Sequence, residues 1–273
     1  MMPGVGHAWW LLHAGGGLWK EFSMTMTMAG TTGSAPAAVA TDLKRTARTT
    51  GLLYLAFFIT GIAGSLVVRA QIFAAGDPQG TLSHLVNHEW LARAGIALEL
   101  GIVLTQVLTA LWLYRLFRGV DTFAALSLAF FGMVNAVAIL GSAAMLATAL
   151  DVAGDGSLAA AGGAAATVQL LYVVSGHLWG VAAVFFGLWL IPMGWLVLRS
   201  RWLPRSLGWI LVAGGVGYLL SAFVTYLLPN ADSLVQLLTV PSVVGEVWMM
   251  GYLLLVGVRE HPSTGVAAVP APR

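Results

Sequence analysis

The chain lacks cysteine and is poor in charge. Without cysteine it can form no disulfide, no thiolate nucleophile and no cysteine-ligated metal site. Only 9% of the 273 residues are charged, against about 25% in a soluble domain. Because 59% of the residues are hydrophobic, a soluble globule of this composition would expose a very large apolar surface. The composition therefore favours a membrane protein.

The few basic residues gather at one end of each long apolar stretch, and the other end has few or none. The clusters are Lys44, Arg45 and Arg48, then Arg115 and Arg118, then Arg199, Arg201 and Arg205, and last Arg259, and the exceptions are Arg69 and Arg93. Membrane insertion keeps the Lys and Arg of short loops on the cytoplasmic side. The alternation thus predicts six crossings with both termini inside. The net charge of +2 then reflects topology and contact with anionic lipid headgroups, and we expect no nucleic-acid partner.

We predict an all-α, polytopic bundle of six transmembrane helices, because backbone groups in lipid must pair within their own segment. The expected crossings cover residues 51–68, 94–113, 122–150, 168–198, 207–228 and 241–258. Pro241 is expected in the first turn of the sixth helix, where its missing N–H is tolerated. A short surface helix is expected from Thr81 to Leu91, between the first two crossings.

Three regions are predicted along the chain: an N-terminal extension over residues 1–43, the six-helix domain over residues 44–259 and a flexible tail over residues 260–273. The extension is interpreted as disordered or weakly interfacial. Its apolar part, His7 to Trp19, is too short to cross a bilayer, which needs about 20 residues. A cleaved signal peptide is the alternative, since Ala38-Val39-Ala40 resembles a cleavage site. Against it, no Lys or Arg precedes the apolar part.

Three ionisable side chains lie inside the predicted crossings: Glu99, His177 and Glu246. A charge at the bilayer centre costs about 2.5–3.5 kcal/mol, so such groups usually face the bundle interior. All three belong to crossings that enter from the outer side. Arg69 ends the first crossing and Arg93 begins the second on that side. We therefore expect these five side chains to share the outer half of the bundle.

Further polar residues lie on shared helix faces: Asn135 in the third crossing, and Tyr218 and Thr225 in the fifth. With the five ionisable residues they are predicted to line an outward-facing pocket for a small-molecule or lipid ligand. The alternative is a structural network in which Arg–Glu pairs neutralise each other and fix the helix register. Gly176 and Gly180 similarly predict either close packing within the chain or a dimer interface, so the oligomeric state stays open.

His84 and His88 share one face of the predicted surface helix, a spacing that suits a metal ion. No third ligand lies at a suitable distance in the sequence, and the zincin pattern is absent. We expect no metal and no cofactor.

The chain resembles the bacterial membrane proteins grouped as "domain of unknown function 4386" over about residues 44 to 259. The resemblance lies in short stretches that occur in the expected order: residues 45–55, 185–190 and 199–208, then Gly217-Tyr218-Leu219 and Gly245-Glu246. It implies a six-helix bundle in the bacterial plasma membrane and no assigned activity. It also implies that Arg69, Arg93, Glu99, His177 and Glu246 are recurring polar positions, although aspartate is expected more often where Glu99 stands.

Three functions are compatible with these features. The first is binding or transport of a small polar or amphiphilic ligand through the polar pocket. The second is a membrane scaffold or sensor in which the polar residues only hold the helices together. The third is an intramembrane enzyme acting on lipid, with Glu99 or Glu246 as general base and His177 as its partner. No complete set of nucleophile, base and electrophile is visible, so no catalytic residue is assigned.

Overall fold

The computed structural model describes residues 35–228 and 230–259. The described residues from Ala40 onward form one compact unit, and every contact below lies within that unit. Residues 1–34 of the predicted extension lie outside the described residues, and so does the whole predicted tail, residues 260–273. Helix α1 begins at Ala35, inside the range predicted as an extension.

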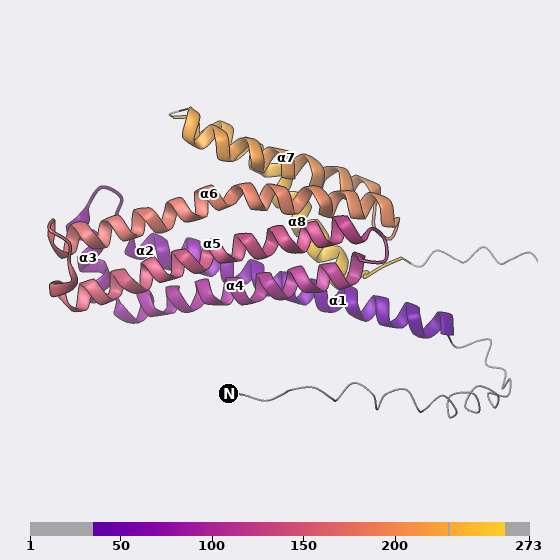
Figure 1. Ribbon diagram of the computed structural model, residues 1–273, viewed down its shortest axis with the longest axis horizontal. Coiled ribbons are helices and arrows are strands. Elements are labelled where there is room, and N and C mark those ends of the chain that lie inside the picture. Colours follow the sequence, from indigo (N-terminus) through magenta and orange to yellow (C-terminus); the bar gives the residue numbers. More distant parts are fainter. Residues whose placement is uncertain (1–34, 229, 260–273) are drawn as a thin grey trace, which may run out of the picture. The chain divides into compact units, whose positions relative to one another are not determined.

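Six long helices and a few short ones make up the described chain, which contains no strand (Figure 1). The helices are α1 (Ala35–Ile62), a π-helical segment η1 (Ala63–Arg69), α2 (Ala70–Ile72), α3 (Pro78–Asn87), α4 (Glu89–Phe117), α5 (Thr122–Gly154), a 3₁₀ turn η2 (Gly156–Leu158), α6 (Gly163–Ser200), α7 (Arg205–Leu227) and α8 (Asp232–Leu255). Six stretches are long and apolar enough to cross a membrane. The prediction of an all-α bundle with six crossings is confirmed.

The short helix α3 begins at a clear sequence signal. Asp77 accepts a hydrogen bond from the N–H of Gly80 over 2.8 Å, and Pro78 fills the first helical position. The predicted surface helix therefore exists as α3, shifted to Pro78–Asn87 and separated from α4 at His88.

The start of α5 follows the same rule. Asp121 precedes the helix and accepts a hydrogen bond from the N–H of Ala124 over 3.1 Å. The carboxylate satisfies one of the backbone donors that the first turn leaves free. The short connection between α4 and α5 therefore ends at Asp121, and α5 begins at Thr122.

Helix α8 begins nine residues before the predicted start and contains Pro241 in its interior. The prediction that Pro241 lies in the first turn is wrong. Proline cannot donate to the carbonyl one turn earlier, yet the helix continues because its N-terminal part packs against α7. A Cβ at Gly217 of α7 would collide with the carbonyl oxygen of Leu238, and a Cβ at Gly214 would lie 2.5 Å from the Cα of Ser242.

Glycines let α6 and α7 approach each other closely. A Cβ at Gly187 would lie 2.7 Å from the carbonyl oxygen of Gly215, and one at Gly194 would lie 2.6 Å from that of Gly208. Side chains longer than hydrogen would force the two backbones apart. These glycines of α6 therefore serve packing within the chain.

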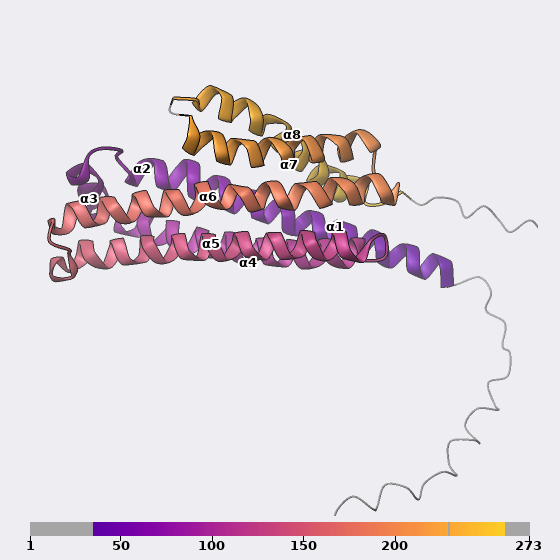
Figure 2. The same cartoon turned by 45° about the horizontal axis from the view of Figure 1, so that its top comes forward.

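Consecutive helices pack side by side: α4 on α5, α5 on α6, α6 on α7 and α7 on α8. Figures 1 and 2 show α3 and the α5–α6 connection at one end of the bundle, which we call the α3 end. The α4–α5 and α6–α7 connections lie at the opposite end, which we call the α6–α7 end. The larger core cluster includes Tyr54 and Trp189, and a smaller one under α3 includes Val68 and Tyr172.

Candidate functional site

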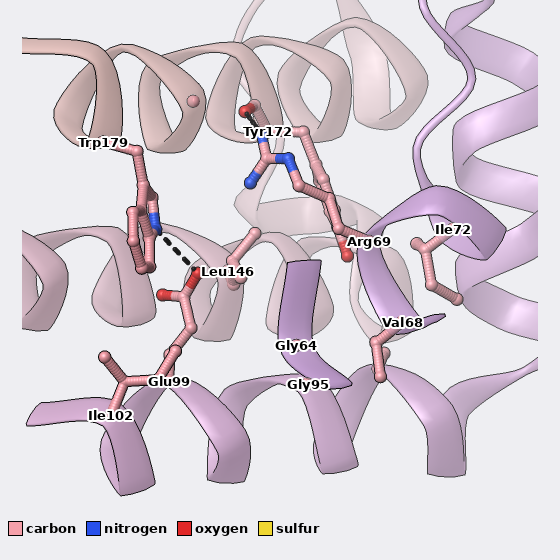
Figure 3. A pocket seen from close by; sticks show the side chains of 12 residues that line it. Gly64, Val68, Arg69, Ile72, Gly95, Glu99, Ile102, Leu146, Tyr172 and Trp179 are labelled. Carbon is pink, nitrogen blue, oxygen red and sulfur yellow. Dashed lines mark hydrogen bonds between the residues drawn. The ribbon is translucent and has the colours of Figure 1, made fainter. Parts of the chain in front are cut away.

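A cavity of about 280 Å³ opens between η1, α4, α5 and α6 near the α3 end (Figure 3). Most of its wall is apolar. Of the eight predicted site residues, two line this cavity, namely Arg69 and Glu99. The full set of lining residues is Gly64, Val68, Arg69, Ile72, Ala92, Gly95, Glu99, Ile102, Leu146, Tyr172, Gly176 and Trp179.

The π-helical segment η1 places Arg69 at the cavity. It covers Ala63–Arg69, so its last residue is the arginine itself. Single π-helical turns inside longer helices are rare and occur often at functional sites. Glycines on two neighbouring helices admit the segment: a Cβ at Gly95 of α4 would lie 2.7 Å from Val68, and one at Gly176 of α6 would lie 3.0 Å from Nη2 of Arg69.

The guanidinium of Arg69 is held by α6. Nη1 donates to the hydroxyl of Ser175 over 2.9 Å, and Nη2 donates to the carbonyl oxygen of Tyr172 over 2.7 Å. The guanidinium carbon also lies 5.5 Å from the ring centre of Phe73 and 5.9 Å from that of Tyr172. The aromatic faces add cation–π attraction. Arg69 is therefore fixed by neutral groups, and its charge is not cancelled by a direct carboxylate contact within 4 Å among the described residues.

Two serine hydroxyls connect Arg69 to Glu99. The Ser142 hydroxyl donates to Oε1 of Glu99 over 3.1 Å, and the Ser142 and Ser175 oxygens are 2.7 Å apart. A hydroxyl has a single proton to donate. Since Ser142 gives its proton to Glu99, Ser175 must donate to Ser142, and Arg69 donates to Ser175. The hydrogen bonds thus run in one direction, from the guanidinium to the carboxylate.

Glu99 has one satisfied and one unsatisfied oxygen. Oε1 accepts from Ser142 and also from Nε1 of Trp179 over 3.2 Å, as Figure 3 shows for the tryptophan. Oε2 is buried and has no hydrogen-bond partner among the described residues, and the residue as a whole is only 7% exposed. A buried polar atom without a partner carries a desolvation cost of about 1–3 kcal/mol, more when it is charged. The carboxylate therefore has an open acceptor at the cavity.

A second polar layer lies deeper in the bundle, on the same faces of α4 and α5. Gln106, seven residues after Glu99, donates through Nε2 to Oδ1 of Asn135 over 2.8 Å. Asn135, seven residues before Ser142, donates in turn to the carbonyl oxygen of Ala182 over 3.0 Å. The predicted face of Asn135 is thus buried between α4 and α6. Its amide is committed to this layer and does not line the cavity.

Glu246 lies elsewhere. Its Oε1 accepts a hydrogen bond from the hydroxyl of Tyr54 over 2.6 Å, and neither residue lines the cavity. Tyr218 stacks on Phe186 with ring centres 5.8 Å apart. The structure thus separates the two buried glutamates, which the sequence predicts around one pocket.

Two further predicted site residues lie outside the cavity, one on α6 and one on α7. His177 is exposed, and its Nδ1 is 3.4 Å from the hydroxyl of Tyr226. Thr225 donates to the carbonyl oxygen of Ser221 within α7. Neither His177 nor Thr225 lines the cavity.

Arg93 is the last of the predicted site residues, and it does not line the cavity. It forms an exposed ion pair with Glu89 over 2.6 Å, four residues earlier on α4. The sequence indicates the depth of a side chain in the bundle, but it does not fix the direction in which that side chain points.

Several residues that bind Arg69 or Glu99 are not among the eight predicted site residues. Ser175 and Tyr172 bind the guanidinium, and Ser142 and Trp179 bind the buried carboxylate. Serines and aromatic residues are common throughout these helices, so residue type alone does not single out these four as site residues. The spacing does give one: Ser142 lies two helical turns from Asn135, and Ser175 lies one turn after Tyr172.

The two histidines near α3 turn to backbone oxygens. Nδ1 of His84 is 3.3 Å from the carbonyl oxygen of Ile72, and Nδ1 of His88 is 3.2 Å from that of His84. Within residues 35–228 and 230–259, no three His, Asp or Glu side chains gather as metal ligands.

Comparison with known proteins identifies a family. The family model described as "Domain of unknown function (DUF4386)" matches residues 49–257. No curated protein and no solved structure matches the chain.

Proposed function

The chain belongs to the DUF4386 family, and we propose that it is a membrane protein that binds a small amphiphilic ligand in the cavity between η1, α4, α5 and α6. One observation carries the proposal: Oε2 of Glu99 is buried, has no partner among the described residues and belongs to a residue at the wall of a cavity. Protein interiors rarely leave such an atom without a donor. A ligand that donates a hydrogen bond would supply it.

The wall of the cavity indicates the chemistry of this ligand. Its polar end would carry an N–H or O–H donor for Glu99, and an acceptor group on the same end would suit Arg69. Its apolar part would lie along Val68, Ile102 and Leu146. The volume of about 280 Å³ is near the lower end of the roughly 300–1,000 Å³ seen for ligand pockets. The ligand is therefore small. We further propose that the cavity lies in the outer half of a bacterial plasma membrane, with both chain termini in the cytoplasm.

A structural role is the second candidate, and the serine chain favours it. The path from Arg69 through Ser175 and Ser142 to Glu99 joins η1, α6, α5 and α4. Such a network would fix the register of four helices without any ligand. The two functions differ in what they require of Oε2 of Glu99. A scaffold does not need an oxygen without a hydrogen-bond donor, whereas a binding site uses that oxygen to accept a hydrogen bond from the ligand.

Mass spectrometry of the purified protein tests the proposal. The protein is extracted in mild detergent, and the small molecules that remain bound are identified for the wild type, E99Q and E246Q. E246Q makes the same change at a buried carboxylate outside the cavity. We expect a bound molecule in the wild type and in E246Q, and its loss from E99Q.

A cavity-filling variant separates binding from stability. A Cβ at Gly64 would make ordinary contacts, 3.6 Å from Leu98, so the longer side chain of G64L extends into the cavity and leaves the serine chain untouched. G64L should lose the ligand while keeping the melting temperature of the ligand-free wild type. If no variant binds anything and only E99Q melts at a lower temperature, the scaffold function is correct and the proposed one is not.

A further inference from the structure

A second hollow lies near the α6–α7 end, on the surface formed by α5, α6 and α7. It is an open groove of about 850 Å³. Trp195 and Trp209 line it and are 50% and 64% exposed. In a soluble protein such an apolar groove would be exposed to water at a cost in free energy. In a membrane protein it faces the lipid. The rest of its wall is mainly apolar, and includes Phe131, Leu188, Ile191 and Val212.

The groove has the length of one lipid leaflet. On α6 it runs from Leu188 to Leu198, which is about 15 Å at 1.5 Å per residue. This is half of the roughly 30 Å hydrocarbon thickness of a bilayer. The exposed tryptophans lie toward its end near the α6–α7 connection, as is usual for tryptophan at the headgroup level. An acyl chain would therefore fit along it.

One end of the groove carries an unpaired positive charge. Arg205, the first residue of α7, lines the groove, and its exposed side chain makes no hydrogen bond or ion pair with any residue among 35–228 and 230–259. The neighbouring Arg199 is engaged: it binds Oδ2 of Asp121 over 3.0 Å and lies 5.8 Å from the ring centre of Trp195. Arg205 is thus the cation of this groove that is available to bind an anionic group of a ligand.

Asp121 also lines the groove and would oppose an anion, but both of its oxygens are committed. Oδ1 accepts from the N–H of Ala124, and Oδ2 accepts from Arg199. The Arg199 pair cancels its charge, and the net charge at this end of the groove is that of Arg205.

We propose that this groove is a docking site for one phospholipid with an anionic headgroup. The headgroup phosphate would bind Arg205, and one acyl chain would lie along α6 between α5 and α7. The site is distinct from the cavity near the α3 end, and it stands or falls independently of the function proposed for that cavity.

Native mass spectrometry of the full chain in detergent tests the proposal. The protein is mixed with equal amounts of phosphatidylglycerol and phosphatidylcholine that carry the same acyl chains. We expect the first bound lipid to be phosphatidylglycerol, and R205Q to lower that preference about fivefold, which corresponds to about 1 kcal/mol for one basic residue at a membrane surface. R118Q is the matched control, since Arg118 is exposed at the same end and does not line the groove.

A bulky side chain tests the acyl part. Ser127 lines the groove and donates only to the carbonyl oxygen of Phe123 within its own helix. S127W should reduce binding of both lipids, whereas R205Q should weaken binding of phosphatidylglycerol more than that of phosphatidylcholine. Equal preferences in R205Q and R118Q would overturn the proposal. So would a wild type that binds both lipids equally, or a dimer that dissociates on S127W without any lipid effect, which would assign the groove to a second copy of the chain.

Discussion

The hydroxyl of Tyr54 on α1 donates a hydrogen bond of 2.6 Å to the carboxylate of Glu246 on α8. Both side chains are buried, Tyr54 completely and Glu246 with 6% exposure. The contact joins two helices that are far apart in the sequence. It lies apart from the cavity that Glu99 and Arg69 line, so the two buried glutamates have different partners and different expected roles.

Removing the Tyr54 hydroxyl should destabilise the bundle. Y54F keeps the ring and its contact with Trp189 but leaves a buried carboxylate oxygen without its donor. We expect the free energy of unfolding to fall by about 1–3 kcal/mol, read as a lower melting temperature in detergent. Y226F serves as the control, because Tyr226 is 48% exposed. Equal melting temperatures for Y54F and the wild type would show that the bond adds no stability.

The contact of α6 with α7 predicts a cost for even a single added methyl group. G187A would place that methyl 2.7 Å from the carbonyl oxygen of Gly215, where the backbone has to move. Overpacking of this kind costs about 1–3 kcal/mol. The matched control is G251A, which has open space around its Cβ in α8 and should be neutral or slightly stabilising. Thermal unfolding of both variants measures the difference, and a tolerated G187A would contradict the close approach.

Acid should weaken the start of α5. The N–H of Ala124 donates to Asp121 and, with the nearby Arg199 guanidinium, lowers the pKa of this carboxyl below its ordinary value of 3.8. A group with a lowered pKa in the folded state adds stability that is complete above its unfolded pKa and is lost as the pH falls through the folded value. We therefore expect the contribution of Asp121 to the melting temperature to be constant from pH 7 to about 5 and to fall below about pH 4.

The variant D121N isolates this effect, since asparagine still caps the helix but does not titrate. It should remove part of the fall below pH 4. Asp155, whose pKa is lowered by hydrogen bonds from Ser157, should still contribute the remainder. A D121N profile identical to that of the wild type would rule out a contribution from Asp121.

The predicted orientation can be read with single cysteines, because the chain has none of its own. S157C lies in the α5–α6 connection at the α3 end, and S200C ends α6 at the opposite end. A membrane-impermeant maleimide should label S157C on intact cells and S200C only after the membrane is opened. The reverse pattern would invert the topology.

The number, type and approximate position of the helices could be predicted from the sequence, and the direction of most side chains could not. A helix that faces lipid on one side and a packed core on the other is apolar on both, so the usual amphipathic pattern that marks the buried face is missing. His177 illustrates this: it directly follows Gly176, which lies against Arg69, and only the packing of α6 turns the imidazole outward.

The shared depth of Arg69 and Glu99 could be predicted, but their geometry could not. The π-helical segment changes the direction in which the side chains after it point around the helix axis. No residue pattern in Ala63–Arg69 predicts this segment. By contrast, the start of α5 at Thr122 follows directly from the capping aspartate before it. Short-range signals set the starts of α3 and α5, and long-range packing sets the site.

The tie between Tyr54 and Glu246 also bears on how the protein is made. Tyr54 enters the bilayer with the first span, whereas Glu246 is synthesised 192 residues later, within the sixth. This hydrogen bond therefore cannot form until the last span of the chain has been synthesised and inserted.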